Sequence, residues 1–336
     1  MKKLKRIFAV FFCLLLASGI LGGCGKAASS SAPAPSASQS GSKPLKIVTT
    51  IFPEYDWVRE ILGDKADHAE VTMLLDNGVD LHSYQPTADD IIKISDCNLF
   101  IYVGGESDGW VEDALKEATN KDMRVINLLD VLGERVKEEE VVEGMEAEEE
   151  ESEDEDEPEY DEHVWLSLKN AETLCNAITD ALEEIDPANK DTYAANAASY
   201  LEKLAALDGE YQAVVDNAVR KTVLFGDRFP FRYLVDDYGL SYYAAFAGCS
   251  AETEASFETI SFLAGRVDEL GLPCVLTIEG AQHKIAETIV QNSAAKNQSI
   301  LTLDSMQSTT SADAANGTTY LSVMESNLDV LKQALN

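Results

Sequence analysis

The sequence predicts an α/β fold with two lobes, each built on a parallel sheet flanked by helices. Short apolar runs alternate with amphipathic helical patterns, which is typical of parallel strands that are buried on both faces. This alternation occurs in two blocks, one on each side of a helical pattern of roughly thirty residues. About 290 of the 336 residues follow an atypical N-terminal segment, which is enough chain for two domains.

The first block, residues 44–186, contains four predicted strands separated by helices. Each strand is a run of β-branched, aromatic or other apolar residues bounded by turn-forming residues. We expect these strands at residues 45–51, 69–75, 99–103 and 124–128. Apolar residues recur every three or four positions in the helical stretches, which we expect at residues 54–62, 87–95, 110–119 and 167–185.

A single long helix is predicted at residues 187–218, directly after Asp186. Its apolar stripe begins at Tyr193 and continues at helical spacing to Val215. Roughly thirty helical residues span about 45 Å. Because the helix lies near the middle of the folded region, we expect it to be a rigid connector between the lobes.

The second block, residues 219–336, repeats the α/β alternation. Strands are expected at residues 222–225, 241–246, 274–278 and 299–303. Helices are expected at residues 231–238, 257–270, 284–293 and 320–335.

The N-terminal segment has the pattern of a bacterial lipoprotein signal peptide. A basic start precedes residues 7–20, an apolar run too short for a comfortable membrane span, and small residues then lead to Cys24. We expect a signal peptide at residues 1–23, lipid on the Cys24 sulfur, and anchoring to the outer face of the cell membrane. The alternative is a secretory signal with an incidental cysteine. Residues 24–43, rich in Ala, Ser and Pro, are expected to be a flexible linker.

The net charge of −34 argues against nucleic acid or anionic lipid as a partner. Residues 138–162 hold seventeen of the acids and no Lys or Arg. We expect residues 138–159 to form a flexible solvated loop. The loop leads directly to His163, so it is either a cation collector for a fixed site or a solubilising segment.

The mature chain would keep Cys97, Cys175, Cys249 and Cys274, and no two of them form a CxxC pair. A zinc knuckle made of thiolates is therefore not expected. The spacing leaves open whether these cysteines form disulfides or stay as buried thiols.

Imidazoles and carboxylates follow several predicted strands. His82 follows a predicted strand of the first block, His163 follows the acidic loop, and Asp227, Glu279 and Asp304 follow strands of the second block. In open α/β sheets, ligands bind beyond the carboxyl ends of strands. Imidazole combined with carboxylate suits Zn²⁺ or Mn²⁺ better than Ca²⁺ or Cu⁺.

Two segments carry a family resemblance. The sequence from His82 to Ile91, HSYQPTADDI, resembles the His-x-Tyr-x-Pro-Thr-x-x-Asp segment of the metal-binding lipoproteins of ABC-type zinc and manganese importers. The sequence DEHVW, which ends at Trp165, is similar to their Asp-x-His-x-Trp segment. Matches such as FPEYDW, GGESDGWV, YGL and ETEAS extend the resemblance from about Leu45 to the C-terminus.

The resemblance implies two lobes joined by one long helix, with a metal ion in the cleft between them. It implies that His82 and His163 are ligands and that Asp304 matches a late carboxylate ligand. Arg228 falls where the family has a His or Glu ligand, and Arg cannot bind a cation. Asp227 is the expected substitute. Arg228 and Glu279 are expected at most to position other ligands.

We therefore expect a monomeric, extracytoplasmic solute-binding lipoprotein that captures Zn²⁺, or alternatively Mn²⁺, and delivers it to the membrane permease of an ABC importer. An enzyme is not expected, because a metal-dependent hydrolase needs an open coordination position and a base, and the chain has no HExxH-like pair. The other alternative is a surface adhesin or structural lipoprotein whose acidic loop binds cations.

Overall fold

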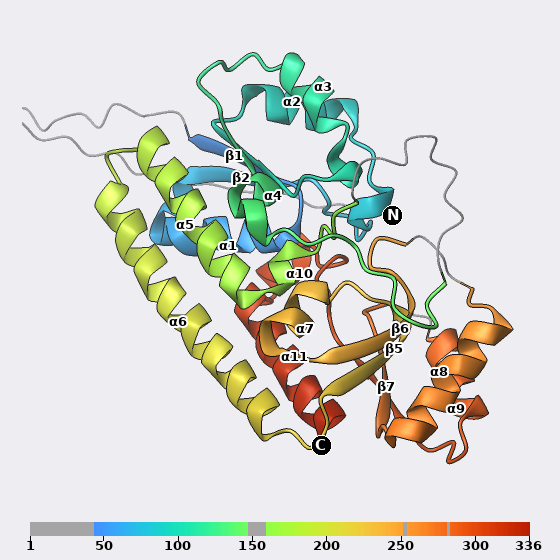
Figure 1. Ribbon diagram of the computed structural model, residues 1–336. Helices are drawn as coiled ribbons and strands as arrows, with labels where there is room; N and C mark the ends of the chain where they lie inside the picture. The colour runs from blue at the N-terminus through green and yellow to red at the C-terminus, as the bar shows by residue number, and fades with distance from the viewer. Residues whose placement is uncertain (1–43, 147–158, 251–253, 281–282) are drawn as a thin grey trace, which may run out of the picture. The chain divides into compact units, whose positions relative to one another are not determined.

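The first lobe is built on a four-stranded parallel sheet in the order β2-β1-β3-β4 (Figure 1). Its strands are β1 (Leu45–Thr49), β2 (Ala69–Met73), β3 (Leu99–Tyr102) and β4 (Arg124–Asn127). Helices α2 (Ala88–Asp96) and α3 (Val111–Lys116) lie on one side, and α1 (Phe52–Leu62) and α5 (Leu168–Ile185) lie on the other. A short helix, α4 (Leu128–Leu132), follows β4 directly and was not predicted.

This computed structural model describes residues 44–146, 159–250, 254–280 and 283–336. The range Pro44–Asn336 forms one compact unit. The predicted signal peptide, Cys24 and the linker lie outside the described residues. Within the described ranges, no helix is both long enough and apolar enough to cross a membrane.

The second lobe repeats the arrangement with the strand order β6-β5-β7-β8, again entirely parallel. Its strands are β5 (Thr222–Arg228), β6 (Ser241–Phe246), β7 (Cys274–Thr277) and β8 (Ser299–Thr302). Helices α8 (Phe257–Leu270) and α9 (Lys284–Asn292) cover one face, and α7 (Arg232–Tyr238) and α11 (Tyr320–Leu335) cover the other (Figure 1). The short α10 (Ser311–Ala315) was not predicted. The predicted fold class, two parallel α/β lobes and a long helix, is confirmed.

The long helix α6 (Lys190–Asn217) has 28 residues, so it is about 42 Å long. Its buried side chains recur at intervals of three or four, from Tyr193 to Val215. One stripe therefore faces the protein along the whole length of the helix, first against α1 and α5 and later against α11.

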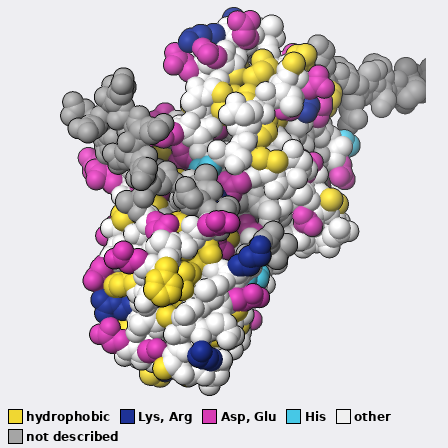
Figure 2. Space-filling view, turned by 90° about the vertical axis from the view of Figure 1, so that its right-hand side faces the viewer, with side chains coloured by type: hydrophobic (Ala, Val, Ile, Leu, Met, Phe, Trp, Pro, Cys, Tyr) yellow, Lys and Arg dark blue, Asp and Glu magenta, His cyan; other side chains and the backbone are white. Residues whose placement is uncertain are grey.

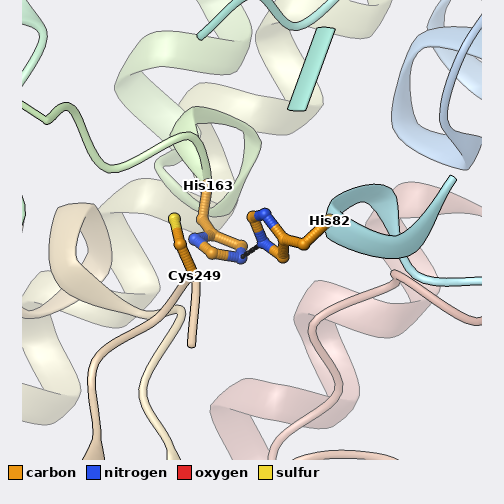
Figure 3. Close-up of side chains that lie close together, drawn as sticks. All are labelled: His82, His163 and Cys249. Carbon is orange, nitrogen blue, oxygen red and sulfur yellow. Dashed lines mark hydrogen bonds between the residues drawn. The ribbon is translucent and has the colours of Figure 1, made fainter. Parts of the chain in front are cut away.

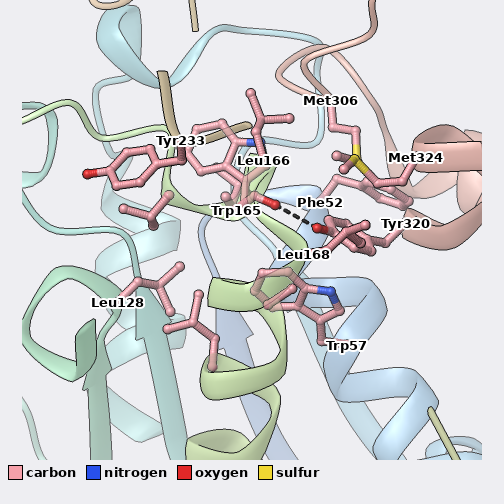
Figure 4. Packing of buried hydrophobic residues seen from close by; sticks show 14 of the residues in the cluster. Phe52, Trp57, Leu128, Trp165, Leu166, Leu168, Tyr233, Met306, Tyr320 and Met324 are labelled. Carbon is pink, nitrogen blue, oxygen red and sulfur yellow. Dashed lines mark hydrogen bonds between the residues drawn. The ribbon is translucent and has the colours of Figure 1, made fainter. Parts of the chain in front are cut away.

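The main apolar core extends through both lobes (Figure 4), and a smaller separate cluster packs α8 and α9 on the second sheet. The ring of Trp57, in α1, packs edge-on against Tyr320, in α11, with centroids 5.1 Å apart. The Tyr320 hydroxyl donates a 2.7 Å hydrogen bond to the Trp165 carbonyl oxygen. The Trp165 indole N–H in turn donates to the Ser305 carbonyl oxygen at 2.9 Å. The Tyr320 hydroxyl and the Trp165 indole N–H, both buried, thus find partners across the junction.

The acidic segment differs from the prediction of a flexible loop over residues 138–159. Within its described part, Glu146 pairs with Phe246 at the end of β6, and Glu143 forms a 3.0 Å ion pair with Arg266 in α8. Glu140 accepts a 3.1 Å hydrogen bond from Tyr242. Residues 138–146 therefore pack on the second lobe, because their carboxylates find specific partners there. Residues 147–158 lie outside the described residues.

Strand β5 is also longer than the strand predicted at residues 222–225. Strand β5 continues to Arg228, and its register with β6 shifts between Phe225 and Arg228. Asp227 consequently lies within the strand, not beyond its end. The irregular register lets the strand extend past a position where the sequence shows a Gly-Asp turn signal.

Candidate metal centre

The imidazoles of His82 and His163 face each other (Figure 3). His82 lies in the short 3₁₀ helix η2 (Leu81–Ser83), and His163 directly precedes η5 (Val164–Leu166). The two Nε2 atoms are 3.2 Å apart. The side chain of His163 is fully buried, and that of His82 is 9% exposed. Two segments 81 residues apart in sequence thus bring two metal-binding nitrogens together.

The Nδ1 atom of each ring is held by the protein. Nδ1 of His163 lies 3.0 Å from Oδ1 of Asp161. Nδ1 of His82 lies 2.8 Å from the Ser107 hydroxyl and 3.4 Å from Oε2 of Glu162. A carboxylate only accepts hydrogen bonds, so these contacts favour a proton on Nδ1 in both rings. The same second contact fixes the orientation of histidines that bind metal ions.

A proton on each Nδ1 directs the Nε2 lone pairs of the neutral rings toward each other. Two lone pairs at 3.2 Å repel unless a cation lies between them. A proton can take that place, and so can a divalent ion bound to both nitrogens. Zn²⁺ with bonds of roughly 2.0 Å to nitrogen separates two tetrahedral ligands by about 3.3 Å. The pair is therefore already close to the spacing that zinc requires.

Glu162 supports this pair as a carboxylate. The backbone N–H of Ser107 donates to its Oε1 at 2.9 Å. Burial alone would raise the pKa of Glu162, but the His82 ring 3.4 Å away and the hydrogen bonding of Ser107 hold it below its usual value. Gly105, with φ of 79°, makes room, because a Cβ atom there would collide with the Glu162 side chain.

Cys249 lies beside the two imidazoles (Figure 3). Its sulfur and one ring nitrogen from each histidine lie within 4.8 Å of one another. Cys249 belongs to the second lobe, on the loop after β6. Burial and the negative charges of Asp161 and Glu139 raise the pKa of its thiol. All four cysteines in the described ranges are free thiols, which resolves the open question of disulfides for this structure.

Arg228 forms an ion pair with Asp80 across the two lobes. Asp80 also caps η2 by accepting a 3.0 Å hydrogen bond from the His82 backbone N–H, and its Oδ1 lies 4.0 Å from His82 Nε2. Although burial opposes it, Arg228 and His82 hold the pKa of Asp80 below its usual value. Arg228 thus pairs with a carboxylate next to the imidazoles.

The predicted carboxylate ligands are placed differently from the histidines. Asp227 accepts hydrogen bonds from the backbone N–H groups of Arg228 and Ile278, at 3.0 and 3.4 Å. Asp304 accepts from the Met306 N–H at 2.8 Å. Among the described residues, neither carboxylate joins a group of three potential ligands within 4.8 Å. Burial raises the pKa of both, and burial with the nearby Glu279 raises that of Asp304 to about 6.

Glu279 organises the loop that carries Asp304. Its carboxylate accepts hydrogen bonds from the Ser305 N–H at 2.7 Å, the Ser305 hydroxyl at 2.8 Å and the Gln307 N–H at 3.0 Å. These contacts use both oxygens, so Glu279 fixes the loop around Ser305 and Gln307.

The sequence matches a known family along its length. A family model described as zinc-uptake complex component A, periplasmic, matches residues 47–334. The chain belongs to this family. The zinc-binding lipoprotein AdcA of Streptococcus pneumoniae is 33% identical over 290 residues, which cover 86% of this chain and 55% of that protein. The chain therefore spans only 55% of the length of that relative.

A second member of the zinc-uptake family matches almost end to end. The high-affinity zinc uptake system protein ZnuA of Bacillus subtilis is 32% identical over 337 residues, covering 99% of this chain and 98% of that protein. Among solved structures, the Zn(II)-bound ZnuA-like domain of S. pneumoniae AdcA has a TM-score of 0.67 at 30% identity, covering 87% of this chain and 99% of that one. The predicted family is confirmed.

Sequence reasoning did not identify three residues that shape the centre. Cys249 was considered only as a thiol of unknown pairing, although Gly248 before it signals a close backbone approach. Asp80 was given no role. Asp161 was quoted only as part of a motif, yet its position two residues before His163 allows the contact with that ring.

Proposed function

We propose that this chain binds Zn²⁺ between its two lobes and delivers it to the permease of an ABC-type importer. The facing Nε2 atoms of His82 and His163, with each Nδ1 held by an acceptor, carry the proposal. The zinc-binding names of relatives at 33% and 32% identity support zinc as the ion. No observation on the described residues favours the adhesin alternative.

Zinc is cargo in this proposal, and no covalent step is assigned to the site. The imidazoles bind the ion through Nε2 while Asp161, Ser107 and Glu162 hold their orientation. Ligating imidazoles must be neutral, so acid weakens the binding. Acidic side chains predominate over basic ones on the face shown in Figure 2, and a negative surface raises the local concentration of cations.

The remaining parts of the proposal concern location and the further ligands. We place the protein outside the cytoplasm as a monomer, held at the membrane by lipid on Cys24. Asp227 and Asp304 stay predictions as metal ligands. Single Asp227→Asn and Asp304→Asn variants test them, because losing a true ligand weakens zinc binding far more than losing a distant charge.

A calorimetric titration of the metal-stripped chain from Lys26 onward, with Zn²⁺ and with Mn²⁺, tests the function. We expect one tight zinc site that disappears in the His82→Ala/His163→Ala variant. His68→Ala is the matched control, since His68 is exposed at the end of η1 (Gly63–His68). Weak, multiple binding that survives the double substitution overturns the proposal.

Delivery needs a separate experiment in cells. A strain that lacks this protein should take up less zinc at limiting concentrations, and the wild-type chain should restore uptake. Restoration by the double histidine variant would contradict a role for this centre in transport.

A further inference from the structure

The second lobe contributes a side chain to the histidine pair. His82 and His163 belong to the first lobe, and Cys249 reaches them from the loop after β6 (Figure 3). One nitrogen from each ring and the Cys249 sulfur all lie within 4.8 Å. Among the described residues this is the only group of three potential metal ligands at that spacing.

The Cys249 loop is held against the imidazoles by specific contacts. A Cβ atom on Gly248 would lie 3.2 Å from Nδ1 and Cε1 of His163 and 2.9 Å from the Phe229 carbonyl oxygen. Only a residue without a side chain approaches this closely without displacing the ring. The Cys249 N–H donates to Oε1 of Glu139 at 3.0 Å, which fixes the direction of the loop.

We propose that Cys249 is the third zinc ligand, so that the cargo is held by two imidazoles and one thiolate. This inference rests on the proposed function. On binding, the S–H bond breaks, an S–Zn bond forms, and the proton leaves to solvent. Tetrahedral zinc with bonds of roughly 2.0 Å to nitrogen and 2.3 Å to sulfur separates its ligands by about 3.3–3.6 Å. The two Nε2 atoms, 3.2 Å apart, already have this spacing, so zinc binding requires mainly that the Cys249 sulfur move closer to them.

A thiolate ligand changes the selectivity of the site. Zinc accepts sulfur readily, whereas manganese prefers oxygen ligands. In this proposal Cys249, instead of Asp227, takes the place of the His or Glu that the resemblance implies at the position of Arg228, which cannot bind an ion. The site then discriminates against Mn²⁺ through its own donor set.

Cobalt(II) is the probe that tests this proposal, because a Co²⁺–thiolate bond gives a charge-transfer absorption in the near ultraviolet that imidazole ligands do not give. The metal-stripped chain from Lys26 onward is titrated with Co²⁺ and then with Zn²⁺. We expect the band in the wild type, its loss when Zn²⁺ displaces Co²⁺, and its absence in Cys249→Ser. Cys274→Ala, at a buried thiol in β7, is the control and should keep the band.

Calorimetry completes the test. Cys249→Ser should bind Zn²⁺ about tenfold or more weakly, release about one proton fewer, and lose part of its preference for Zn²⁺ over Mn²⁺. Tight Co²⁺ and Zn²⁺ binding without the band in the wild type overturns the role of Cys249 and leaves the proposed function intact. An absence of tight binding in the wild type overturns both.

A second measurement uses only the wild-type chain, so its result does not depend on whether a variant folds. Alkylation of the wild-type chain, mapped by mass spectrometry, should modify Cys249 in the metal-free form and spare it when Zn²⁺ is bound. Equal modification in both forms would contradict ligation.

Discussion

The orientation of the His163 ring is set by a near neighbour in sequence. Asp161, two residues earlier, accepts hydrogen bonds from the His163 backbone N–H at 2.9 Å and lies 3.0 Å from the ring Nδ1. One carboxylate therefore fixes the backbone and the tautomer together. The opposite nitrogen, Nε2, is left facing His82.

The Asp161→Asn substitution should weaken zinc binding by about 10- to 100-fold, the usual effect of removing a carboxylate that orients a ligating histidine. The amide can present its N–H₂ to Nδ1 and so favours the tautomer with the proton on Nε2. Calorimetric titration measures the change. Asp122→Asn, an exposed change ahead of β4, is the control. Equal affinities in the two variants would contradict the orienting role.

Glu54 provides a second prediction at the scale of a residue. It is fully buried at the start of α1, where its Oε2 accepts from the Thr50 N–H at 2.8 Å and the Ile51 N–H at 3.3 Å. Burial raises its pKa from 4.5 to about 8. Between these values the folded state holds a proton that the unfolded state has lost. The contribution of Glu54 to the free energy of unfolding therefore falls as pH rises from 4.5 to about 8.

The Glu54→Gln variant keeps an acceptor oxygen but does not titrate. Its stability should depend less on pH than that of the wild type, by roughly 3–5 kcal/mol across the window. Urea unfolding at about pH 5 and about pH 9 measures this difference. Glu202→Gln, at an exposed position of α6, should behave like the wild type. Parallel pH profiles for wild type and Glu54→Gln would show that the buried carboxyl does not control this dependence.

At the scale of elements, the end of β5 sets the charge next to the centre. Arg228 at the end of this strand pairs with Asp80, which caps η2 directly before His82. The pair is nearly neutral as a whole. Removing the guanidinium leaves one negative charge beside the imidazoles.

We expect Arg228→Leu to bind Zn²⁺ roughly tenfold more tightly at low salt, because Asp80 then attracts the divalent ion without compensation. The gain should shrink as ionic strength rises. Arg124→Leu breaks an exposed ion pair with Glu184 at β4 and is the matched control. Unchanged or weaker binding in Arg228→Leu would mean that Arg228 acts by holding the lobes or Asp80 in place.

The two parts of the acidic segment, residues 139–146 and 147–158, should contribute differently to zinc binding. Neutralising the nine acids in residues 147–158, at constant length, should leave the tight zinc site intact. Neutralising the four acids between Glu139 and Glu146 should weaken it, because Glu139 holds the Cys249 N–H. Zinc titration of both variants measures the contrast. A larger loss of zinc affinity in the 147–158 variant would mean that this stretch is the principal cation binder.

At the scale of the whole molecule, the continuous core predicts that Pro44–Asn336 unfolds in one cooperative transition. Trp165 and Tyr320 join the lobes through buried hydrogen bonds, so neither lobe opens without exposing this junction. The three tryptophans all belong to the first lobe, at positions 57, 110 and 165. Urea transitions followed by tryptophan fluorescence and by far-ultraviolet circular dichroism should therefore coincide. Two separate midpoints would show that the lobes fold independently.

The sequence by itself determined the fold class and the order of the elements. Helix α11 and strand β6 begin and end at the predicted residues, because apolar periodicity and capping residues are local signals. Local signals did not predict the elements whose bounds depend on tertiary packing. The short helices α4 and α10 lack a full apolar period, and β5 passes through a Gly-Asp sequence that reads as a turn.

The metal centre likewise combines residues that local sequence predicts with contacts that only the structure shows. His82 and His163 stand in motifs that can be recognised in the sequence, and their Nδ1 contacts include a near neighbour, Asp161. The third side chain, Cys249, and the Arg228–Asp80 pair depend on contacts between residues far apart in the chain, 148 positions in the case of that pair. No local pattern encodes such contacts, because they depend on how the two parallel sheets pack around a shared core. The two imidazoles can thus be recognised from local sequence, whereas the side chains that lie around them depend on the tertiary structure.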